Sequence, residues 1–289
     1  MKPLLAHVYE PHRVIYPCYV QPKLNGIRAL YQGGRFQSRD ELPFPVGLLD
    51  HLSTPLQTAF GPKVILDGEL YVHGWPLQRI NAAVTPVRQT PTEDTLKVEY
   101  HVFDVVDFGK SFEERMEWLW QQGGFTVDTP LRQPLTTTAH TEAIANEFYA
   151  DFVANGYEGM MYRLGDCPYT KPKQANTEQR VVAHLRNKFL SDKDNRCWHL
   201  LKRKDWQDDE FVCEGVAEGE GKYAGTLGAL KCVCSSGWGH FTVSGGLTDA
   251  LRDKYWDHPE LIIGKQIKVR YLCLSSDGIP LNPTIEAIL

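Results

Sequence analysis

The 289-residue sequence lacks the features that define several common classes of protein. No apolar run reaches the roughly 18 residues that a membrane-spanning helix needs, and the N-terminus has no stretch typical of a signal peptide. The seven cysteines are odd in number and have no paired spacing, which favours reduced thiols in a cytoplasmic protein over a disulfide framework. Internal repeats and low-complexity tracts are also missing from the sequence.

Two familiar binding motifs are present only in part. Cys232-x-Cys234 has no second pair at zinc-finger spacing, so we do not expect a structural zinc site. The run Gly219-Glu220-Gly221-Lys222 lacks the Gly-x-x-x-x-Gly-Lys-Ser/Thr spacing of a phosphate-binding P-loop. Any nucleotide site in this chain must therefore be built in another way.

The net charge of −5 gives no general sign of a nucleic-acid binder. The charge is uneven, however, because ten Lys or Arg and only three acidic residues lie between Lys171 and Lys204, a local excess of +7. We expect the basic segment 171–196 to contact nucleic-acid phosphates, while a solvated loop with a helix is the alternative.

The length and the 42% hydrophobic content suit two domains with cores of their own. We expect one domain over residues 1–207 and another over 208–289. In the second, segments 211–217, 227–234, 239–244 and 265–274 are predicted strands, and a helix starts near Thr248. One helix before the last strands is typical of an OB-fold barrel.

In the first domain, periodicity predicts helices over 48–60 and 141–154, and a capping box at Ser111 predicts a helix after it. Strands are predicted over 64–72 and 100–106, and residues 76–98 are interpreted as a polar connector. Within the strand 64–72, Asp67-Gly68 predicts a turn or a bulge. Glu69 is then a carboxylate among apolar neighbours, which is costly unless it is bonded to another group.

The stretch from Gln21 to Arg28 contains a lysine just before an Asn-Gly pair. Asn25-Gly26 predicts a tight turn with a positive φ at the glycine, flanked by strands. Lys23 would then lie at a strand end, where its side chain can project into a cleft. From these residues alone, a surface lysine beside a hairpin turn is the alternative.

Several motifs follow one another along the chain in the order found in ATP-dependent DNA ligases of the covalent nucleotidyltransferase superfamily. The sequence resembles that family in Lys23-Leu24-Asn25-Gly26-Ile27-Arg28, Ser38-Arg39, Asp67-Gly68-Glu69, Phe103-Asp104, Glu158-Gly159 and Leu201-Lys202-Arg203-Lys204. The resemblance implies an α+β fold, with an adenylation domain of antiparallel sheets and helices followed by an OB-fold barrel.

The resemblance also implies how ATP is bound. Phe103 would stack on the purine, Gln21 would help to discriminate the base, and Glu69 would hydrogen-bond the ribose. Arg39 would meet the nucleotide or the DNA end. Stacking alone provides affinity with little discrimination between bases, so hydrogen bonds must supply it.

The remaining implied roles concern the phosphates. Lys23 would attack the α-phosphate and carry AMP, with Arg28, Lys202 and Lys204 as further catalytic and nucleotide-binding residues. Glu158, together with Glu69, would hold Mg²⁺, with Mn²⁺ as the alternative. Nearby cations would favour the neutral, nucleophilic form of a lysine.

Two departures from the family pattern stand out. Asn25 occupies the usual place of an aspartate, so we expect an altered rate or metal preference but the same nucleophile. The C-terminal stretch lacks the Arg-x-Asp-Lys-type motif that orients the outgoing pyrophosphate. The candidates for that role are Lys222, Lys265, Lys268 and Arg270.

The resemblance therefore implies an enzyme that seals nicks in duplex DNA through lysyl-AMP and a DNA-adenylate. We expect a monomer that closes around nicked DNA, away from membranes, in the cytoplasm of a bacterium or a virus-infected cell. The alternatives are an RNA ligase, an mRNA-capping guanylyltransferase, and an inert nucleic-acid-binding homologue.

Overall fold

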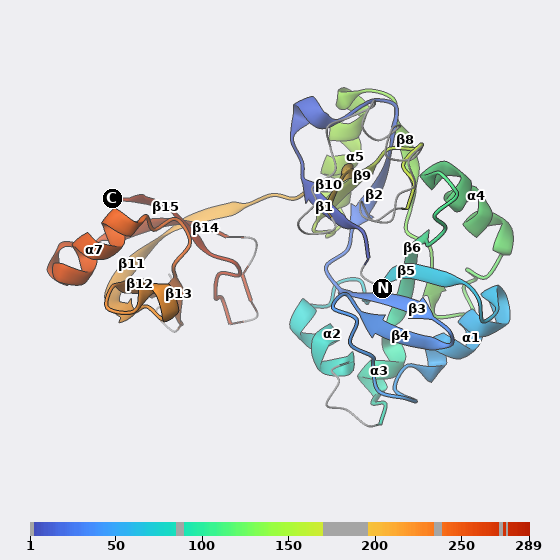
Figure 1. The fold of residues 1–289 in the computed structure, drawn as a ribbon, viewed down its shortest axis with the longest axis horizontal. Helices are drawn as coiled ribbons and strands as arrows, with labels where there is room; N and C mark the ends of the chain where they lie inside the picture. Colours follow the sequence, from blue (N-terminus) through green and yellow to red (C-terminus); the bar gives the residue numbers. More distant parts are fainter. Residues whose placement is uncertain (1–2, 85–89, 170–195, 234–238, 272–273, 276) are drawn as a thin grey trace. The chain divides into compact units, whose positions relative to one another are not determined.

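The computed structural model describes residues 3–84, 90–169, 196–233, 239–271, 274–275 and 277–289 (Figure 1). The chain divides into two compact units, Met1–Lys204 and Asp205–Leu289. The boundary that we expected after residue 207 lies at the first residue of β11 (Gln207–Glu218), in the second unit. The predicted basic segment falls outside the described residues, except for its last residue, Arg196.

The first unit contains two five-stranded sheets, which we call sheets A and B. Their neighbouring strands are antiparallel, except that β1 runs parallel to β10 and β6 runs parallel to β7. Sheet A has the order β1 (Leu5–Val8), β10 (Arg196–Arg203), β9 (Gly159–Arg163), β2 (Cys18–Lys23), β8 (Thr137–Ala139). Sheet B has the order β4 (Arg35–Ser38), β3 (Ile27–Gln32), β5 (Ile65–Tyr71), β6 (Glu99–Val105), β7 (Leu131–Arg132).

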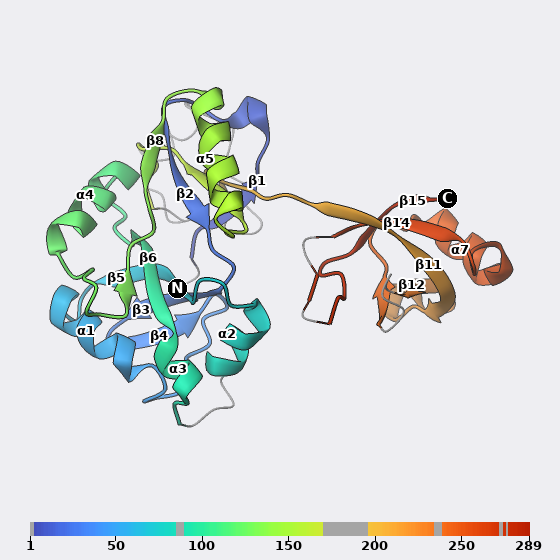
Figure 2. The same ribbon diagram turned by 180° about the vertical axis from the view of Figure 1, so that it is seen from behind.

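The three helices predicted in this unit are confirmed as α1 (Asp50–Phe60), α4 (Phe112–Gln122) and α5 (Glu142–Ala154). The capping box before α4 is present, since Glu114 N donates to Ser111 Oγ at 3.2 Å and Ser111 N donates to Glu114 Oε2 at 2.7 Å. Helix α5 packs on β2 and β9 of sheet A, and α4 packs on β6 of sheet B (Figures 1 and 2). The helices thus cover the sheets that carry the predicted site.

The interpretation of residues 76–98 as a connector is wrong, because this stretch contains α2 (Leu77–Val84) and α3 (Glu93–Lys97). Ile80, Ala83 and Val84 of α2 are buried. The Thr95 hydroxyl donates to Ala83 O at 2.7 Å and fastens α3 to α2. Both helices are shorter than the ten or so residues over which helical periodicity is convincing.

The Asn25-Gly26 pair connects two sheets instead of closing a hairpin, since β2 belongs to sheet A and β3 to sheet B. The prediction of a positive φ at Gly26 is also wrong. A Cβ atom on Gly26 would lie 2.4 Å from Leu70 O and 2.8 Å from Glu69 Cγ. Gly26 is therefore needed for its close approach to β5, and not for its conformational freedom.

The second unit is a five-stranded antiparallel sheet with the order β13-β12-β11-β14-β15. A parallel bridge between Gly245 and Thr284 joins its two edges, which closes the sheet into a barrel. The elements are β11, β12 (Leu227–Val233), β13 (His240–Val243), α7 (Asp249–Asp257), β14 (Gln266–Tyr271) and β15 (Thr284–Ile288). The sequence prediction found all of these except β15, which follows Pro280 and Pro283 closely.

Candidate active site

Three neighbouring strands of sheet A bring distant residues together. Lys23, the last residue of β2, pairs with Gly159, the first residue of β9, and the amide of Glu158 donates to Lys23 O at 3.0 Å. On the other side of β9, Lys202 pairs with Met161, and Lys204 follows directly after the end of β10. The strand order β10-β9-β2 therefore places Lys202 and Lys204 on one side of Glu158 and Lys23 on the other.

The Glu158 side chain bridges the two outer strands. Its Oε2 accepts a hydrogen bond from Lys23 Nζ, and its Oε1 accepts one from Lys204 Nζ at 3.4 Å. The side chains of Lys23, Glu158 and Lys204 are 19%, 10% and 15% exposed. We call these three residues the lysine cluster; it is mostly enclosed but still reachable from solvent.

Gly159 is what lets β10 come so close. A Cβ atom on Gly159 would lie 2.1 Å from Arg203 O and 2.9 Å from Lys204 Cα, and its φ of +147° is one that side chains rarely adopt. The glycine of the Glu-Gly motif is therefore a packing requirement for bringing Lys204 next to Glu158.

Glu69 enters the site from sheet B. Its Oε1 accepts a hydrogen bond from the amide of Gly26 at 3.2 Å, which answers the question of how a carboxylate is tolerated there. Burial raises the pKa of Glu69 to about 7, although the nearby charges of Lys23 and Arg28 and the Gly26 amide act in the opposite direction. The carboxylate therefore changes its protonation near neutral pH.

Gln21 of sheet A and Phe103 of sheet B contact each other. Gln21, on β2, is buried, and its Nε2 donates to Thr136 Oγ1 at 2.8 Å and to Phe103 O at 3.5 Å. The half-buried Phe103 ring, on β6, has the guanidinium carbons of Arg28 and Arg163 5.2 and 5.4 Å from its centroid. The two predicted base-binding residues are thus brought together.

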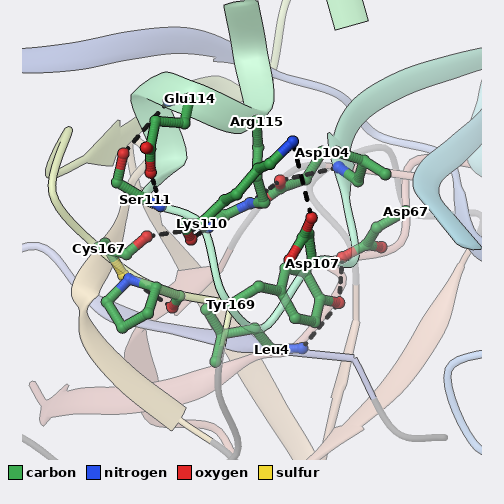
Figure 3. Close-up of polar contacts among 12 residues, drawn as sticks. Leu4, Asp67, Asp104, Asp107, Lys110, Ser111, Glu114, Arg115, Cys167 and Tyr169 are labelled. Carbon is green, nitrogen blue, oxygen red and sulfur yellow. Dashed lines mark hydrogen bonds and ion pairs between the residues drawn. The ribbon is translucent and has the colours of Figure 1, made fainter. Parts of the chain in front are cut away.

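Arg28 is paired with Asp67, a contact that the sequence did not predict. Arg28 Nε and Nη2 donate to the two oxygens of Asp67 at 2.9 and 2.6 Å. The Tyr169 hydroxyl donates to Asp67 Oδ2 at 2.7 Å and accepts from the amide of Leu4 at 3.4 Å (Figure 3). Asp67 lies beside a bulge between β5 and β6, so the predicted bulge is confirmed and the predicted turn is not.

A second buried group, Asp104, Arg115 and Arg163, was also not anticipated as a unit. Arg115 donates to both oxygens of Asp104 at 2.7 and 3.1 Å, and Arg163 Nη1 donates to Asp104 Oδ2 at 2.8 Å (Figure 3 shows Arg115 against Asp104). Arg115 also donates to Lys110 O and Cys167 O. We call these three residues the arginine cluster. The only sequence signal for it was an aspartate inside an apolar strand.

Lys202 and Arg39 have different environments. Burial lowers the pKa of Lys202, and the neighbouring charges of Lys204, Lys23 and Arg196 lower it further. Arg39 lies in an exposed turn after β4, and its ion pair is with Asp40 at 3.8 Å. Lys202 is thus in the cationic group around Lys23, while the role of Arg39 stays a prediction.

The carboxylates near Lys23 suit a hard cation such as Mg²⁺, which prefers oxygen ligands. Within the residues that the structure describes, no group of three His, Cys, Asp or Glu residues could hold a metal ion. Glu158 and Glu69 could therefore supply part of a coordination shell, and phosphate and water oxygens would have to complete it.

Two of the four basic candidates in the second unit already have acidic partners. Lys268 pairs with Asp208 at 2.9 Å and Glu286 at 3.5 Å, and Arg270 pairs with Glu286. Lys222 lies over the Tyr223 ring at 4.4 Å.

None of the helices in the described parts of the chain is long and apolar enough to cross a membrane.

The described residues thus form a two-sheet domain in which a strand-end lysine lies beside a carboxylate and a second lysine, and an OB-type barrel follows along the chain. The chain belongs to the ATP-dependent DNA ligase family. The family model described as ATP dependent DNA ligase domain matches residues 3–177, and the model described as DNA ligase OB-like domain matches residues 218–288.

Individual relatives agree with this assignment. The DNA ligase of African swine fever virus, isolate Warthog/Namibia/Wart80/1980, is 28% identical over 293 residues, which cover 91% of this chain and 61% of the viral protein. The chain thus spans about three fifths of the curated relatives that it matches.

Solved structures show the same fold. A Lig E DNA ligase gives a TM-score of 0.77 at 20% identity, covering 100% of this chain and 99% of that one. A Chlorella virus DNA ligase-adenylate gives a TM-score of 0.54 at 22% identity, covering 100% and 98%. The expected fold, an adenylation domain followed by an OB-fold, is confirmed.

Proposed function

We propose that this protein is an ATP-dependent DNA ligase that seals nicks in duplex DNA, with Lys23 as the covalent nucleophile. The observation that carries the proposal is the lysine cluster, in which Glu158 contacts both Lys23 and Lys204 at the ends of the two strands that flank β9. The charge of Lys23 acts on Glu69, and Phe103 O accepts a hydrogen bond from Gln21, two residues before Lys23. Family membership supports the same conclusion.

In the first step, the neutral Lys23 amine attacks the α-phosphorus of ATP. A nitrogen–phosphorus bond forms and the amine gives up one proton to solvent, while the bond from the α-phosphorus to the bridging oxygen breaks and pyrophosphate leaves with that oxygen. Lys202 and Lys204 would place positive charge beside the α-phosphate, where negative charge develops. Burial is the first cause of the lowered pKa of Lys202, and the charges of Lys204 and Lys23 beside it lower that pKa further.

In the second step, an oxygen of the 5′-phosphate at the nick attacks the same phosphorus, and the bond to Lys23 breaks. AMP is then a good leaving group on the DNA end. In the third step, the 3′-hydroxyl attacks the 5′-phosphate, AMP leaves, and a phosphodiester bond forms.

The nucleoside is held by residues of both sheets. Phe103 would stack on the purine, and Glu69, with its pKa near neutrality, would accept a hydrogen bond from the ribose when ionised or donate one when protonated. Mg²⁺, held by Glu158 with Glu69 as a second carboxylate, would supply positive charge to the phosphate oxygens. Arg28, already bound to Asp67, would orient Phe103 and the ribose side of the site.

The partners of the enzyme follow from this chemistry. We propose that it binds ATP and nicked duplex DNA as a monomer that closes around the DNA, and that it acts in the cytoplasm of a bacterium or a virus-infected cell. We expect the barrel of the second unit to bind DNA together with the first unit, because OB-folds bind oligonucleotides.

The test is covalent labelling. Purified protein is treated with pyrophosphate to remove any AMP that it already carries, then incubated with α-³²P-ATP or α-³²P-GTP and Mg²⁺ and run on a denaturing gel. We expect a label from ATP on the wild-type chain and none on Lys23→Ala. A label from GTP in preference to ATP would favour a capping guanylyltransferase.

The polynucleotide is identified in a second assay. The labelled enzyme is offered a nicked DNA duplex, a nicked RNA duplex and a blunt DNA duplex. Sealing of nicked DNA is the expected result, and sealing confined to RNA would favour an RNA ligase. Binding of nicked DNA without any AMP transfer would contradict the proposal and leave the inert homologue.

A further inference from the structure

A cavity of about 620 Å³ lies beside the first residues of β2 and the first turn of α4. Its volume is within the range of pockets that hold small organic molecules, about 300–1,000 Å³. Among the described residues that line it, there is no member of the lysine cluster or of the arginine cluster. The cavity is therefore built from other residues than the proposed nucleotide site and is a candidate for a second binding site.

The lining of this cavity carries negative charge. Glu113, in the first turn of α4, and Asp166, in the loop after β9, line it, and no Lys or Arg does so among the described residues. Proteins bind nucleic-acid phosphates mainly through Lys and Arg. DNA and the phosphates of ATP are therefore unsuitable occupants, and the charge favours a cation.

His199 of β10 adds a buried nitrogen atom without a partner. Cys18 and His199 are the most buried of the lining residues, at 2% and 6% exposed, so they form the floor of the cavity. Within the described part of the chain, His199 Nδ1 has no hydrogen bond. An unpaired polar atom is costly to bury, so a ligand that supplies its missing partner gains binding energy.

The neighbouring Cys167 thiol indicates which form of the His199 ring is present. Cys167 Sγ donates to Pro168 O at 3.4 Å, so towards His199, another of its hydrogen-bond partners, the sulfur can only accept. Because Nδ1 makes no hydrogen bond, the proton that the sulfur accepts lies on Nε2. In the neutral ring, Nδ1 is therefore an acceptor.

The polar groups of the cavity thus require hydrogen-bond donors. Glu113 Oε1 accepts from the Tyr19 hydroxyl at 2.8 Å, and Glu113 Oε2 has no hydrogen bond among the described residues. Ile15, Pro17 and Leu164 add an apolar wall. We propose that this cavity binds organic cations with an aliphatic stem, namely alkylammonium or alkylguanidinium groups, which donate several hydrogen bonds and accept none.

This chemistry has two sources: a free polyamine, or a lysine or arginine side chain of a partner protein. Spermidine is the probe for the first source, and the peptide acetyl-Leu-Arg-Leu-amide is the probe for the second. The inference goes beyond the proposed function and does not depend on it, because the cavity shares no described lining residue with the lysine cluster.

The test is isothermal titration calorimetry of the full chain with each probe. Glu113→Gln removes a charge from the cavity but keeps an acceptor for the Tyr19 hydroxyl, so the melting temperature without ligand should be retained. Glu117→Gln is the matched control, since it removes the same charge from an exposed position of the same helix, outside the cavity. We expect the dissociation constant of the probe that binds to rise by about tenfold or more in Glu113→Gln and to be unchanged in Glu117→Gln.

A pair of smaller probes tests the need for a positive charge. Pentylamine and 1-pentanol have the same aliphatic stem, and only the amine is charged at neutral pH. We expect wild-type protein to bind the alcohol about tenfold more weakly than the amine. Equal binding of the two would overturn the inference, because the apolar wall alone would then explain the affinity.

The remaining outcomes identify the source or refute the site. Tighter binding of spermidine than of the peptide points to a free polyamine, and the reverse points to a basic side chain of a protein. Equal weakening by Glu113→Gln and Glu117→Gln would overturn the inference, since it would show a general attraction of cations to an acidic protein. The absence of measurable binding of all these cations at millimolar concentration would also overturn it. A failure of covalent labelling by ATP would instead refute the proposed function and leave this site unaffected.

Discussion

The lysine cluster and the arginine cluster each place one carboxylate between two cations, yet they use different cations in different surroundings. In the lysine cluster, the side chains are 10–19% exposed and each lysine makes one contact with Glu158. In the arginine cluster, Asp104, Arg115 and Arg163 are 0%, 1% and 6% exposed, and Arg115 donates two hydrogen bonds to Asp104.

The choice of cation explains the difference in use. Arginine keeps its proton at any ordinary pH and holds a carboxylate in a fixed fork, so it suits a permanent support. Lysine has a flexible stem and can lose its proton, as a nucleophile must. The same arrangement of charges is thus a structural support at one place and, under the proposed function, a reactive site at the other.

The largest expected effect comes from Asp104→Asn in the arginine cluster. Removing this charge leaves two buried guanidinium groups without the carboxylate that they bind, and we expect the free energy of unfolding to fall by about 3–5 kcal/mol. Urea denaturation followed by circular dichroism measures it. A loss below about 1 kcal/mol would contradict the view that the cluster supports the fold.

Glu158→Gln is the matched change in the lysine cluster. The cost in stability should be smaller, about 1–2 kcal/mol, because both lysines reach solvent. Labelling with ATP should be lost nevertheless. If Glu158→Gln kept full labelling and lost more stability than Asp104→Asn, the two clusters would have been assigned the wrong way round.

Gly26→Ala tests how closely the lysine strand must approach sheet B. Its Cβ would lie 2.4 Å from Leu70 O, so the connection between the sheets must shift. We expect a loss of about 1–3 kcal/mol in stability and a clear fall in labelling. Gly109→Ala is the control, since its Cβ would meet only Asp107 Oδ1 at 3.5 Å. Equal effects of the two substitutions would refute the packing argument.

Glu69 provides a test by pH, since burial raises its pKa from 4.5 to about 7. The folded state holds this proton more tightly than the unfolded state does, so the contribution to stability is complete below pH 4.5 and is lost as the pH rises to about 7. We expect wild type to lose about 1–2 kcal/mol relative to Glu69→Gln over that range. Chemical denaturation at pH 4.5, 6 and 8 measures the difference, and a constant difference would exclude a raised pKa.

The smallest expected effect is that of Asn25→Asp. A new negative charge beside Lys23 should change the rate of labelling a few-fold and shift the Mg²⁺ concentration that gives half the maximal rate. Labelling over a Mg²⁺ titration, with Mn²⁺ in parallel, measures both. Identical curves for the two proteins would show that residue 25 does not influence the metal.

The sequence predicted the order of elements well where periodicity was strong, as in α4, α5 and the first four strands of the barrel. It failed at α2 and α3, which are too short to show a period, and it did not find β15, which begins directly after Pro283. The turn at Gly26 was mispredicted because the residues next to Gly26 in the sequence carry no information about Leu70 O of β5. That carbonyl is distant in the chain but lies against Gly26 in the fold.

Several predicted site residues contact one another in the structure, but some of their partners were not predicted. Lys23, Glu158 and Lys204 are brought into contact, and Gln21 meets Phe103, as a shared nucleotide site requires. The partners Asp67, Tyr169 and Thr136 were not predicted, because each contact depends on strand register or on a loop from another part of the chain. The exposed position of Arg39 leaves its role for experiment.

The wide spacing of the lysine cluster along the chain has a consequence for biosynthesis. Glu158 lies 135 residues after Lys23, and Lys204 follows another 46 residues later. Because β10 is inserted between β1 and β9, a nascent chain that ends before β10 carries Lys23, the proposed nucleophile, without Lys202 and Lys204. We therefore expect a ribosome-bound fragment that ends before β10 not to react with ATP. Covalent labelling by ATP is expected only after β10 has been made.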